Sequence, residues 1–293
     1  MIDVKEAKTT TQSEYKIIEI HPMTGNLGAE ISNVNLDQLD DETFAEIKKA
    51  FLEYQVIVFR DQDIKYQSHI DLGKRFGELY VHPYVTPLED YPQMIRLLKK
   101  ATDKFNNGGS WHFDLTFVDE PPMGSILRLI DVPAYGGDTM FSNMYTAYDA
   151  LSPSMKKYLE GLKAVHTSAQ LFGPTCFYTI NKNNTSMGQI PNIGSFVSLH
   201  PLVRTHPETG RKGLFVNSGY IERILNIPAR ESENILNFLY LHCGQAEFSS
   251  RIKWQKDTIT MWDNRCVMHY AMNDYQGLRR EGVRVTIAGD VPV

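Results

Sequence analysis

The chain has 293 residues and a formal net charge of −5, with an isoelectric point near 6.0, so its charge gives no reason to expect a nucleic acid or an anionic membrane as a partner. Hydrophobic residues make up 42% and charged residues 22% of the sequence, which is typical of a globular protein with a substantial core. The cysteines Cys176, Cys243 and Cys266 are odd in number and lack the spacing of a metal site. They favour a reducing compartment over a disulfide framework.

Two further classes are excluded by the distribution of apolar residues. The sequence contains no run of about eighteen apolar residues, so we expect no membrane span. Residues 1–15 are polar and mixed in charge and do not resemble a signal peptide. We therefore expect a cytoplasmic protein, and we expect residues 1–14 to be disordered.

The first part of the chain predicts strands and helices in alternation. Acidic residues that precede an apolar stripe at helical spacing indicate a capped helix, and a short continuous apolar run indicates a buried strand. The predicted elements are a strand over residues 17–20, a helix from Asp40 or Asp41 to about Tyr54, a strand over 56–59, and a helix over 66–76 that ends at Gly77.

The most informative stretch is residues 108–117 (GGSWHFDLTF). We expect a strand here, in which His112 and Asp114 would point to the same face because side chains alternate. A second histidine in an apolar setting, His269, follows far downstream. Two histidines and one carboxylate leave the opposite face of a metal open, which suits Fe(II) and oxygen chemistry. The alternative, which is common for so short a motif, is a polar pair on an ordinary strand.

The remainder predicts further strands, two helical regions and one long loop. The loop covers residues 172–194, is rich in Asn, Gly and Pro, and is expected to be an active-site lid or a disordered insertion. The other predicted elements are strands over 125–130 and 139–142, a helix over 147–162 broken near Pro153, a strand at 161–165, two strands within 202–216, a helix over 228–242, and strands over 248–254 and 258–262.

These elements predict the fold class. Many short strands with Gly and Pro turns favour a mainly β sandwich or barrel with flanking helices. The sequence shows no internal repeat, low-complexity segment or linker. We therefore expect residues 1–293 to form a single domain.

Two arginines follow His269 in the segment 280–287 (REGVRVTI). In a strand, Arg280 and Arg284 share one face and the apolar residues take the other. This face could simply be exposed to solvent. Near a metal site, however, a planar and permanently charged guanidinium would suit an anionic ligand.

The motifs GGSWHFDLTF, YGGDTMFSN, LHPLVRTHPETGRKGLFVN and WDNRCVMHYAMNDYQGLRREGVRVTIAGD occur in this order over most of the chain. This pattern resembles the TauD/TfdA (taurine dioxygenase) family of Fe(II)- and 2-oxoglutarate-dependent oxygenases. The resemblance implies a double-stranded β-helix (a jelly-roll, cupin-like core) that uses Fe(II), 2-oxoglutarate and O2. It also implies that His112, Asp114 and His269 bind the metal, and that Thr139 and Arg280 bind the distal carboxylate of 2-oxoglutarate.

The resemblance also implies candidates for the substrate site. Arg284 would meet the acidic group of the substrate and lie close to 2-oxoglutarate, and His82 would contact the substrate. Gly108 stands where taurine-type members have an asparagine, so Asn107 is the nearest candidate for that role, and Phe172 in the predicted loop could cover the substrate. The expected substrate is a small organic acid, such as a sulfonate (taurine, for example), a carboxylate, a sulfate ester or a phosphonate.

One alternative class stays open on the residues themselves. A jelly-roll metal protein without oxygenase activity, either a zinc-type hydrolase or a ligand-binding module, could use the same three metal ligands. Thr139 and Arg280 distinguish the two classes, because a hydrolase has no reason to keep a carboxylate clamp beside the metal. By analogy with the family we expect a homo-oligomer, either a dimer or a tetramer.

Overall fold

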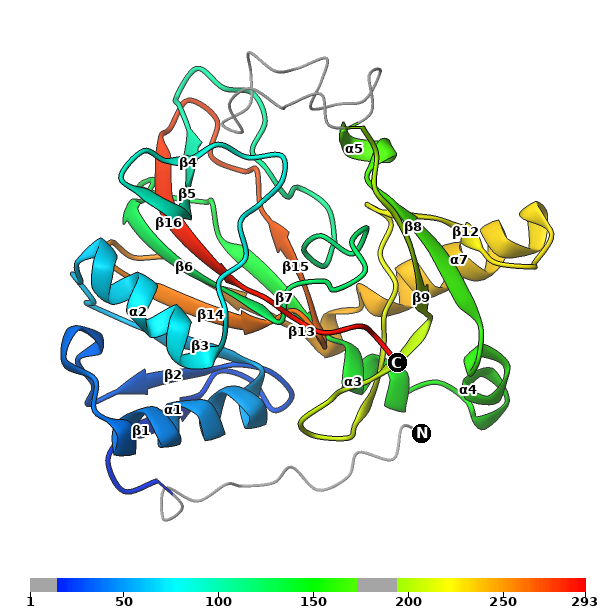
Figure 1. The fold of residues 1–293 in the computed structure, drawn as a ribbon, viewed down its shortest axis with the longest axis horizontal. Helices are drawn as coiled ribbons and strands as arrows, with labels where there is room; N and C mark the ends of the chain where they lie inside the picture. Colours follow the sequence, from blue (N-terminus) through cyan, green and yellow to red (C-terminus); the bar gives the residue numbers. More distant parts are fainter. Residues whose placement is uncertain (1–14, 173–193) are drawn as a thin grey trace.

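The computed structural model describes residues 15–172 and 194–293 (Figure 1). The expectation of disorder over residues 1–14 falls outside this part of the chain. So does the lid proposed within the loop 172–194, apart from its two end residues.

The largest sheet has eight strands in the order β1-β2-β3-β14-β6-β16-β5-β4, and its only parallel pair is β2 with β3. β3 and β14 are buried along their whole length, which explains why β3 consists of a continuous apolar run. The strands are β1 (Glu19–Pro22), β2 (Ala29–Ser32), β3 (Val56–Phe59), β14 (Ile259–Asp263), β6 (Gly124–Asp131), β16 (Arg280–Ile287), β5 (Tyr91–Lys99) and β4 (Pro87–Leu88).

A second sheet, in the order β13-β7-β15, packs against the large one. A buried cluster joins the two sheets: Val56, Val58 and Trp262 from the large sheet meet Phe141 and Val267 from the small one. The fold is therefore a mainly β sandwich with flanking helices, as the sequence predicts. The remaining strands are β13 (Ser249–Ile252), β7 (Thr139–Asn143), β15 (Val267–Ala271), β12 (Ile221–Ile224), β8 (Lys163–Thr167), β9 (Val197–Pro201), β10 (Val203–Thr205) and β11 (Lys212–Leu214).

The helices cover the sandwich from outside (Figure 1). α1 and α2 lie against the large sheet, where Phe51 and Leu72 join the cluster that contains Ile126 and Met261. α3 and α7 belong to a separate core beside the small sheet. The helices are η2 (Leu36–Gln38), α1 (Asp41–Tyr54), α2 (Tyr66–Phe76), α3 (Met144–Asp149), α4 (Pro153–Leu159), α5 (Ala169–Phe172), α7 (Ala229–Cys243) and η3 (Ala246–Phe248). None of the described helices is long and apolar enough to cross a membrane.

The first two predicted helices agree with the structure. The side chain of Asp40 accepts a hydrogen bond from the main-chain N–H of Thr43 at 2.7 Å and so begins α1. The predicted helix over residues 147–162 was wrong in extent. The structure has two short helices here, because Asn143 caps α3 and Ser152 begins α4 with Pro153 in its first turn.

Strands β2, β4, β5, β9, β12 and β15 were not predicted. In β5, residues of both faces are partly or fully buried, so its sequence does not alternate between apolar and polar residues. The first predicted strand, over residues 17–20, begins two residues later, at Glu19.

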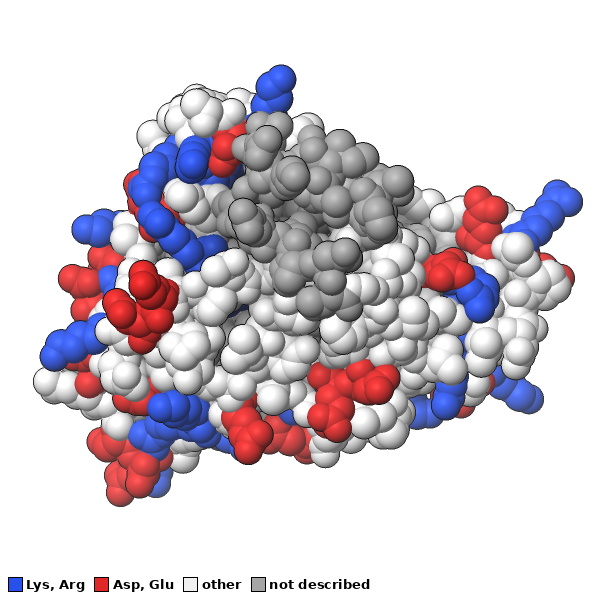
Figure 2. Space-filling view, turned by 45° about the horizontal axis from the view of Figure 1, so that its top comes forward, with Lys and Arg blue, Asp and Glu red and all other residues white. Residues whose placement is uncertain are grey.

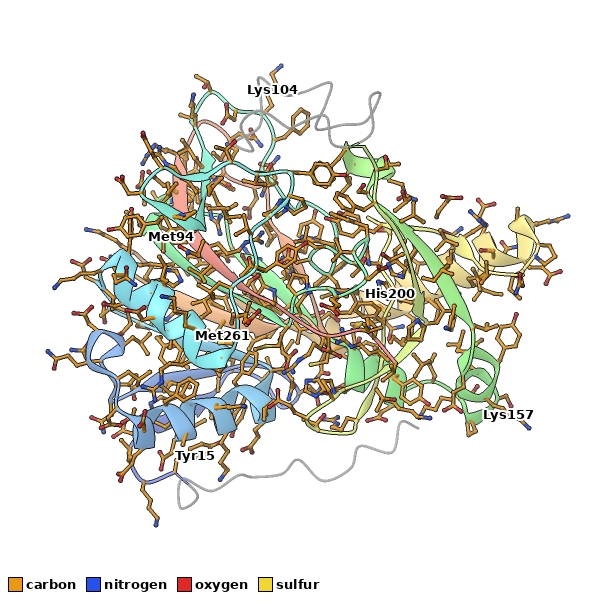
Figure 3. All side chains as sticks on the ribbon, viewed as in Figure 1. Tyr15, Met94, Lys104, Lys157, His200 and Met261 are labelled. Carbon is orange, nitrogen blue, oxygen red and sulfur yellow. The ribbon has the colours of Figure 1, made fainter. Side chains whose placement is uncertain are left out.

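The interior and the surface differ as the composition leads one to expect. Met261 and His200 lie among the core side chains, whereas Lys104 and Lys157 reach into solvent (Figure 3). On the face shown in Figure 2, acidic and basic side chains are interspersed, and outside the grey atoms no large patch carries a single sign.

Several histidines are buried away from the cavity described below. His69 is 1% exposed and donates a ring N–H to the carbonyl of Ile126 at 3.1 Å. Burial lowers its pKa to about 4. Burial also lowers the pKa of His166 and of His200. The folded chain therefore holds these rings neutral under conditions in which the unfolded chain would protonate them.

We predict that the metal-free protein loses stability as the pH falls from 6.5 towards 4. A histidine with a lowered pKa binds fewer protons when folded than when unfolded, so its contribution is complete above pH 6.5 and declines below it. For His69 the decline amounts to roughly 3 kcal/mol. Urea unfolding at pH 7.5 and at pH 5 measures the effect. His69→Gln keeps a donor for Ile126, and its pH slope should be shallower; equal slopes in both proteins would contradict the prediction.

Candidate active site

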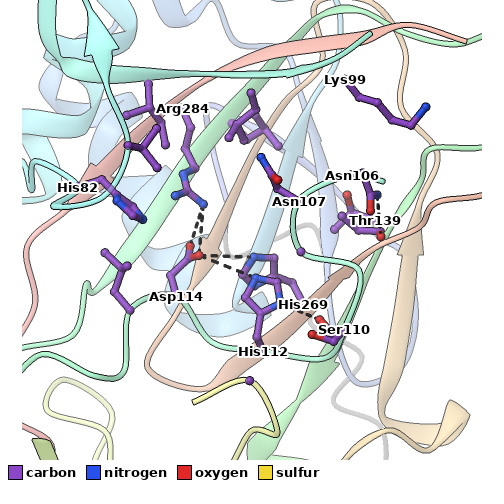
Figure 4. A pocket seen from close by; sticks show the side chains of 18 of the residues that line it. His82, Lys99, Asn106, Asn107, Ser110, His112, Asp114, Thr139, His269 and Arg284 are labelled. Carbon is purple, nitrogen blue, oxygen red and sulfur yellow. Dashed lines mark hydrogen bonds and ion pairs between the residues drawn. The ribbon is translucent and has the colours of Figure 1, made fainter. Parts of the chain in front are cut away.

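One cavity lies between the two sheets, and all nine residues that the sequence marked as site candidates line it (Figure 4). They come from β7, β15, β16, α5 and the connecting loops, which are distant in sequence. The candidates are His82, Asn107, His112, Asp114, Thr139, Phe172, His269, Arg280 and Arg284.

His112 and His269 are brought together by their main chains. They form an isolated antiparallel bridge, in which each donates its N–H to the carbonyl of the other, at 3.1 Å and 2.9 Å. Directly opposed residues of such a pair place their side chains on one face. The two imidazole centroids lie 4.1 Å apart. Of the two residues, His269 lies in the strand β15, whereas His112 lies outside the named strands.

The prediction of a strand through His112 and Asp114 was wrong. Apart from the bridge at His112, residues 108–117 form turns and bends. Leu115 adopts a left-handed conformation with a φ of 53°, which costs about 1 kcal/mol for a residue with a side chain of this kind. Asp114 reaches the histidines because the loop bends towards them.

The carboxylate of Asp114 completes a cluster suited to one metal ion. Its Oδ1 lies 4.0 Å from Nε2 of His112 and 3.9 Å from Nε2 of His269. Ligand atoms of the three residues all lie within 4.8 Å of one another. The hydroxyl of Ser125 donates to Oδ2 at 3.1 Å, so the other oxygen is turned towards the histidines.

The protonation states also suit a metal. Burial lowers the pKa of both His112 and His269, which keeps the rings neutral and their lone pairs available. Nδ1 of His112 donates to the carbonyl of Ser110 at 2.7 Å, so its Nε2 carries the lone pair. Burial would raise the pKa of Asp114, but the charge of Arg284, together with the hydrogen bond from the Ser125 hydroxyl, lowers it overall.

Arg280 and Thr139 lie on the wall of the cavity, where their donor groups could bind a carboxylate. Arg280 is 9% exposed, its Nε has no hydrogen-bond partner, and it makes no ion pair within the described residues. Its guanidinium lies over the ring of Trp254, 5.5 Å from the centroid. The hydroxyl of Thr139 accepts the indole N–H of Trp254 at 3.0 Å, so its own hydrogen is free to be donated elsewhere. A buried cation beside a donor hydroxyl calls for an anion.

Arg284 shares the face of Arg280, as the strand parity predicts. Val283 and Val285 point the other way and pack against Ile70 of α2. Arg284 is 8% exposed, so the solvent-exposed alternative for this face was wrong. Its Nη1 lies 3.2 Å from both oxygens of Asp114 (Figure 4), and its Nε has no partner among the described residues.

His82 lies beside Arg284 (Figure 4). Its Nδ1 accepts the main-chain N–H of Tyr84 at 3.0 Å, so the ring hydrogen is on Nε2. Burial lowers the pKa of His82 to about 3, helped by the charge of Arg284. Phe172 stacks on Tyr84 with centroids 4.3 Å apart, and its ring lies 6.5 Å from that of His82.

Three residues that shape the site were not predicted: Ser125, Trp254 and Asn264. Ser125 and Trp254 give no signal in the sequence, because a serine within a strand and a tryptophan at a strand end are ordinary. Asn264 does give one: it belongs to a run of three polar residues, 263–265, within an otherwise apolar segment.

A second group of potential ligands, His206, Asp263 and Cys266, lies outside the cavity. Asp263 already accepts from Arg265 at 2.8 Å and 2.7 Å and contacts Nε2 of His206 at 3.0 Å. Its charge is therefore compensated, and we assign this group to a buried ion-pair network. His206 therefore has a structural role, and so does His200, whose Nε2–H donates to the carbonyl of Val118 at 2.9 Å.

The geometry defines a class of protein: a β sandwich whose cavity holds two histidines and one carboxylate that could bind a metal ion, with a buried arginine and a threonine hydroxyl in the same lining. Comparison with known families agrees with this class. Residues 19–286 match the Taurine catabolism dioxygenase TauD, TfdA family, and the chain belongs to it.

Individual relatives support this assignment. The chain is 35% identical to an alkylsulfatase of Acinetobacter baylyi, over 97% of this chain and 89% of that protein. It is 34% identical to an alpha-ketoglutarate-dependent sulfate ester dioxygenase of Pseudomonas putida, over 94% and 91%. The crystal structure of a taurine dioxygenase from Burkholderia xenovorans superposes with a TM-score of 0.80 at 33% identity, over 95% and 93%.

These findings confirm several predictions. The fold is a jelly-roll core with flanking helices. The protein is a 2-oxoglutarate-dependent non-haem iron dioxygenase that uses Fe(II), 2-oxoglutarate (alpha-ketoglutarate) and O2 and acts on a small organic molecule. The alternative of a metal protein without oxygenase activity is not favoured.

Gly108 provides a direct test of the metal centre. It has a φ of 82°, and a Cβ at this position would lie 3.0 Å from Cε1 of His112. We predict that Gly108→Ala displaces the imidazole and weakens binding of Co(II), used in place of iron, by about tenfold or more. Gly161→Ala is the matched control, since Gly161 has a φ of 83° and open space around it. Equal cobalt affinity in the two variants would contradict the prediction.

Proposed function

We propose that this dioxygenase hydroxylates a small organic acid that carries an apolar chain, an alkyl sulfonate or an alkyl sulfate ester, at a carbon held beside the metal. His112, Asp114 and His269 bind Fe(II). Thr139 and Arg280 bind the distal carboxylate of 2-oxoglutarate. The proposal rests above all on the buried Arg280, a cation without an ion-pair partner among the described residues, close to the three ligands.

When bound, Fe(II), 2-oxoglutarate and O2 supply the oxidant that hydroxylates a C–H bond and release succinate and carbon dioxide. The protein supplies binding, orientation and electrostatics. Arg280 and Thr139 orient the cosubstrate from its far end, and the apolar lining limits the access of water. If the hydroxylated carbon carries a sulfur or ester oxygen, the product then breaks down to an aldehyde and the free acid.

The acidic end of the substrate is assigned to Arg284 and His82. Arg284 provides a permanent charge, and its Nε has no partner among the described residues. His82 is neutral and presents Nε2–H as a donor. A sulfonate or sulfate has three oxygens and can accept from both side chains. Asn107 lines the same cavity and is proposed as a further polar contact.

The remainder of the substrate is assigned to an apolar wall, which we define as Val85, Ile95, Leu97, Leu171 and Phe172. These five residues pack together and line the cavity. Among the described lining residues Asp114 is the only acid, and it faces the two histidines. The described wall therefore has no free carboxylate for the ammonium group of taurine, and an apolar chain suits it better.

A zinc hydrolase would use the same three ligands but would have no function for Arg280 and Thr139. The experiment that tests the proposed function is succinate formation from 2-oxoglutarate across a panel of organic acids under Fe(II). Substrate-dependent succinate supports the proposal. Equal, uncoupled turnover with every acid would contradict the assigned substrate class.

We predict that Arg280→Gln raises KM for 2-oxoglutarate by roughly tenfold to a hundredfold, because a charge-assisted bond contributes about 1.5–3 kcal/mol. Steady-state kinetics with varied 2-oxoglutarate measures this change. Arg279→Gln is the control: Arg279 is the neighbouring residue, but it is exposed and pairs with Asp131 and Glu281. Similar KM values for both variants would refute the role of Arg280.

We predict that kcat/KM rises along a series of straight-chain alkyl sulfonates from two to eight carbons, because each buried methylene contributes about 0.8 kcal/mol. Taurine should be a poor substrate. Leu97→Ser should reduce the preference for long chains and leave KM for 2-oxoglutarate unchanged. A flat series, or a preference for taurine, would show that the wall does not bind the substrate chain.

We also propose a cytoplasmic, single-domain enzyme that assembles as a homodimer or homotetramer. Cys243 and Cys266 are free, buried thiols, in keeping with a reducing compartment. α7 exposes two large apolar side chains, Phe238 at 44% and Leu241 at 79%, which favours association. Light scattering coupled to size-exclusion chromatography measures the oligomeric state, and a monomer at micromolar concentration would contradict this part of the proposal.

A further inference from the structure

The main chain of Asp114 is held by one side chain, that of Asn264. Oδ1 of Asn264 accepts the N–H of Asp114 at 2.7 Å, and its Nδ2 donates to the carbonyl of Asp114 at 3.0 Å. The same Nδ2 donates to the carbonyl of Pro122 at 3.0 Å. The side chain thus binds Asp114 as a neighbouring strand would.

Asn264 is itself fixed. It is fully buried, and its main-chain N–H donates to the carbonyl of Met123 at 2.9 Å. It follows directly after β14, and Met123 directly precedes β6, the neighbouring strand. Asn264 therefore joins the ligand loop to the most deeply buried part of the large sheet.

This support is needed because of the local geometry of the loop. After the bridge at His112 the chain leaves regular structure, and the next turn includes the left-handed Leu115. In a strand, the N–H and carbonyl of Asp114 would be bonded by the adjacent strand. Here the buried polar groups would lose their partners if Asn264 were absent.

The carboxylate has a second support. Ser125, on β6, donates to Oδ2, which leaves Oδ1 directed towards the two histidines. Asn264 therefore holds the main chain of Asp114 in position, and Ser125 sets the orientation of the Asp114 carboxylate. Neither side chain faces the substrate wall.

We infer that Asn264 is a positioning residue of the metal centre, which places the Asp114 carboxylate so that its Oδ1 faces the Nε2 atoms of His112 and His269. This inference rests on the proposed role of Asp114 as a metal ligand. Groups that hold a ligand in this way typically change metal affinity tenfold to a hundredfold when they are removed. A residue that merely stabilised the fold would leave the geometry at the metal unchanged.

The test is Asn264→Asp, which has the same shape but loses both donor bonds of Nδ2. Metal-free protein is titrated anaerobically with Co(II), and the affinity and the visible ligand-field spectrum are recorded together with the melting temperature. We expect an affinity about tenfold to a hundredfold lower and an altered spectrum. More succinate should form per molecule of product, while KM for 2-oxoglutarate stays within about twofold of the wild type.

Asn143→Asp is the matched control. Asn143 is also buried, caps α3, and donates from Nδ2 to the carbonyl of Asn26 and to Gln55. Its substitution removes the same number of buried donor bonds away from the cavity. It should lower the melting temperature and leave the cobalt spectrum as in the wild type. Ser125→Ala should change the spectrum in the same direction as Asn264→Asp.

A cobalt affinity and spectrum in Asn264→Asp equal to those of Asn143→Asp would overturn the positioning role. If Asn264→Asp does not fold, Asn264→Ser, which brings no charge into the core, undergoes the same titration and is judged by the same criterion. Asp114→Ala tests the ligand role itself. If Asp114→Ala binds cobalt like the wild type, the proposed metal site fails and the positioning role with it.

Discussion

The buried charge of Asp114 is the interaction on which the site depends. An ionised carboxylate is unfavourable away from water unless other groups compensate it. Here Arg284 lies 3.2 Å from both of its oxygens, and Ser125 donates to one of them. The burial that disfavours the ionised form of the carboxylate also keeps His112 and His269 neutral. In the same water-poor environment, Asp114 is therefore an anion and the two histidines have neutral ring nitrogens. This is a donor set that suits a divalent cation.

The cavity carries an excess of positive charge before any ligand enters. Arg280 and Arg284 are both nearly inaccessible, and the described wall contributes a single acid. Fe(II) adds two further charges. A dianionic cosubstrate and an acidic substrate would offset most of this positive charge, to which the buried Lys99 also contributes. The charge distribution thus favours the binding of two acids together. Because the two arginines are spaced along one face of β16, each acid would bind at a different position in the cavity.

In the proposed function, the apolar wall determines which organic acids bind as substrates. The family as a whole acts through the same metal and cosubstrate, so the metal centre says little about the substrate. The apolar wall and Gly108 line the cavity apart from the three candidate metal ligands. Gly108 is needed here because its backbone passes within contact distance of His112, where a side chain would clash with the imidazole. An asparagine in this position would require a different path of the loop.

The sequence alone determined the parts of this protein that follow from local rules. The Asp40 cap and the apolar stripe of α1, the end of α2 at Gly77, the apolar run of β3, and the alternation that sets Arg280 and Arg284 on one face depend on residues close in the chain. The motifs around His112, Thr139 and His269 identified the family. The tertiary structure decided what depends on residues far apart. The main-chain bridge between His112 and His269, the left-handed turn at Leu115, and the bonds of Ser125 and Asn264 to Asp114 leave no local periodicity. A loop that is held by distant side chains can have a sequence that predicts a strand. Its backbone conformation is set only when those distant side chains are in contact with it.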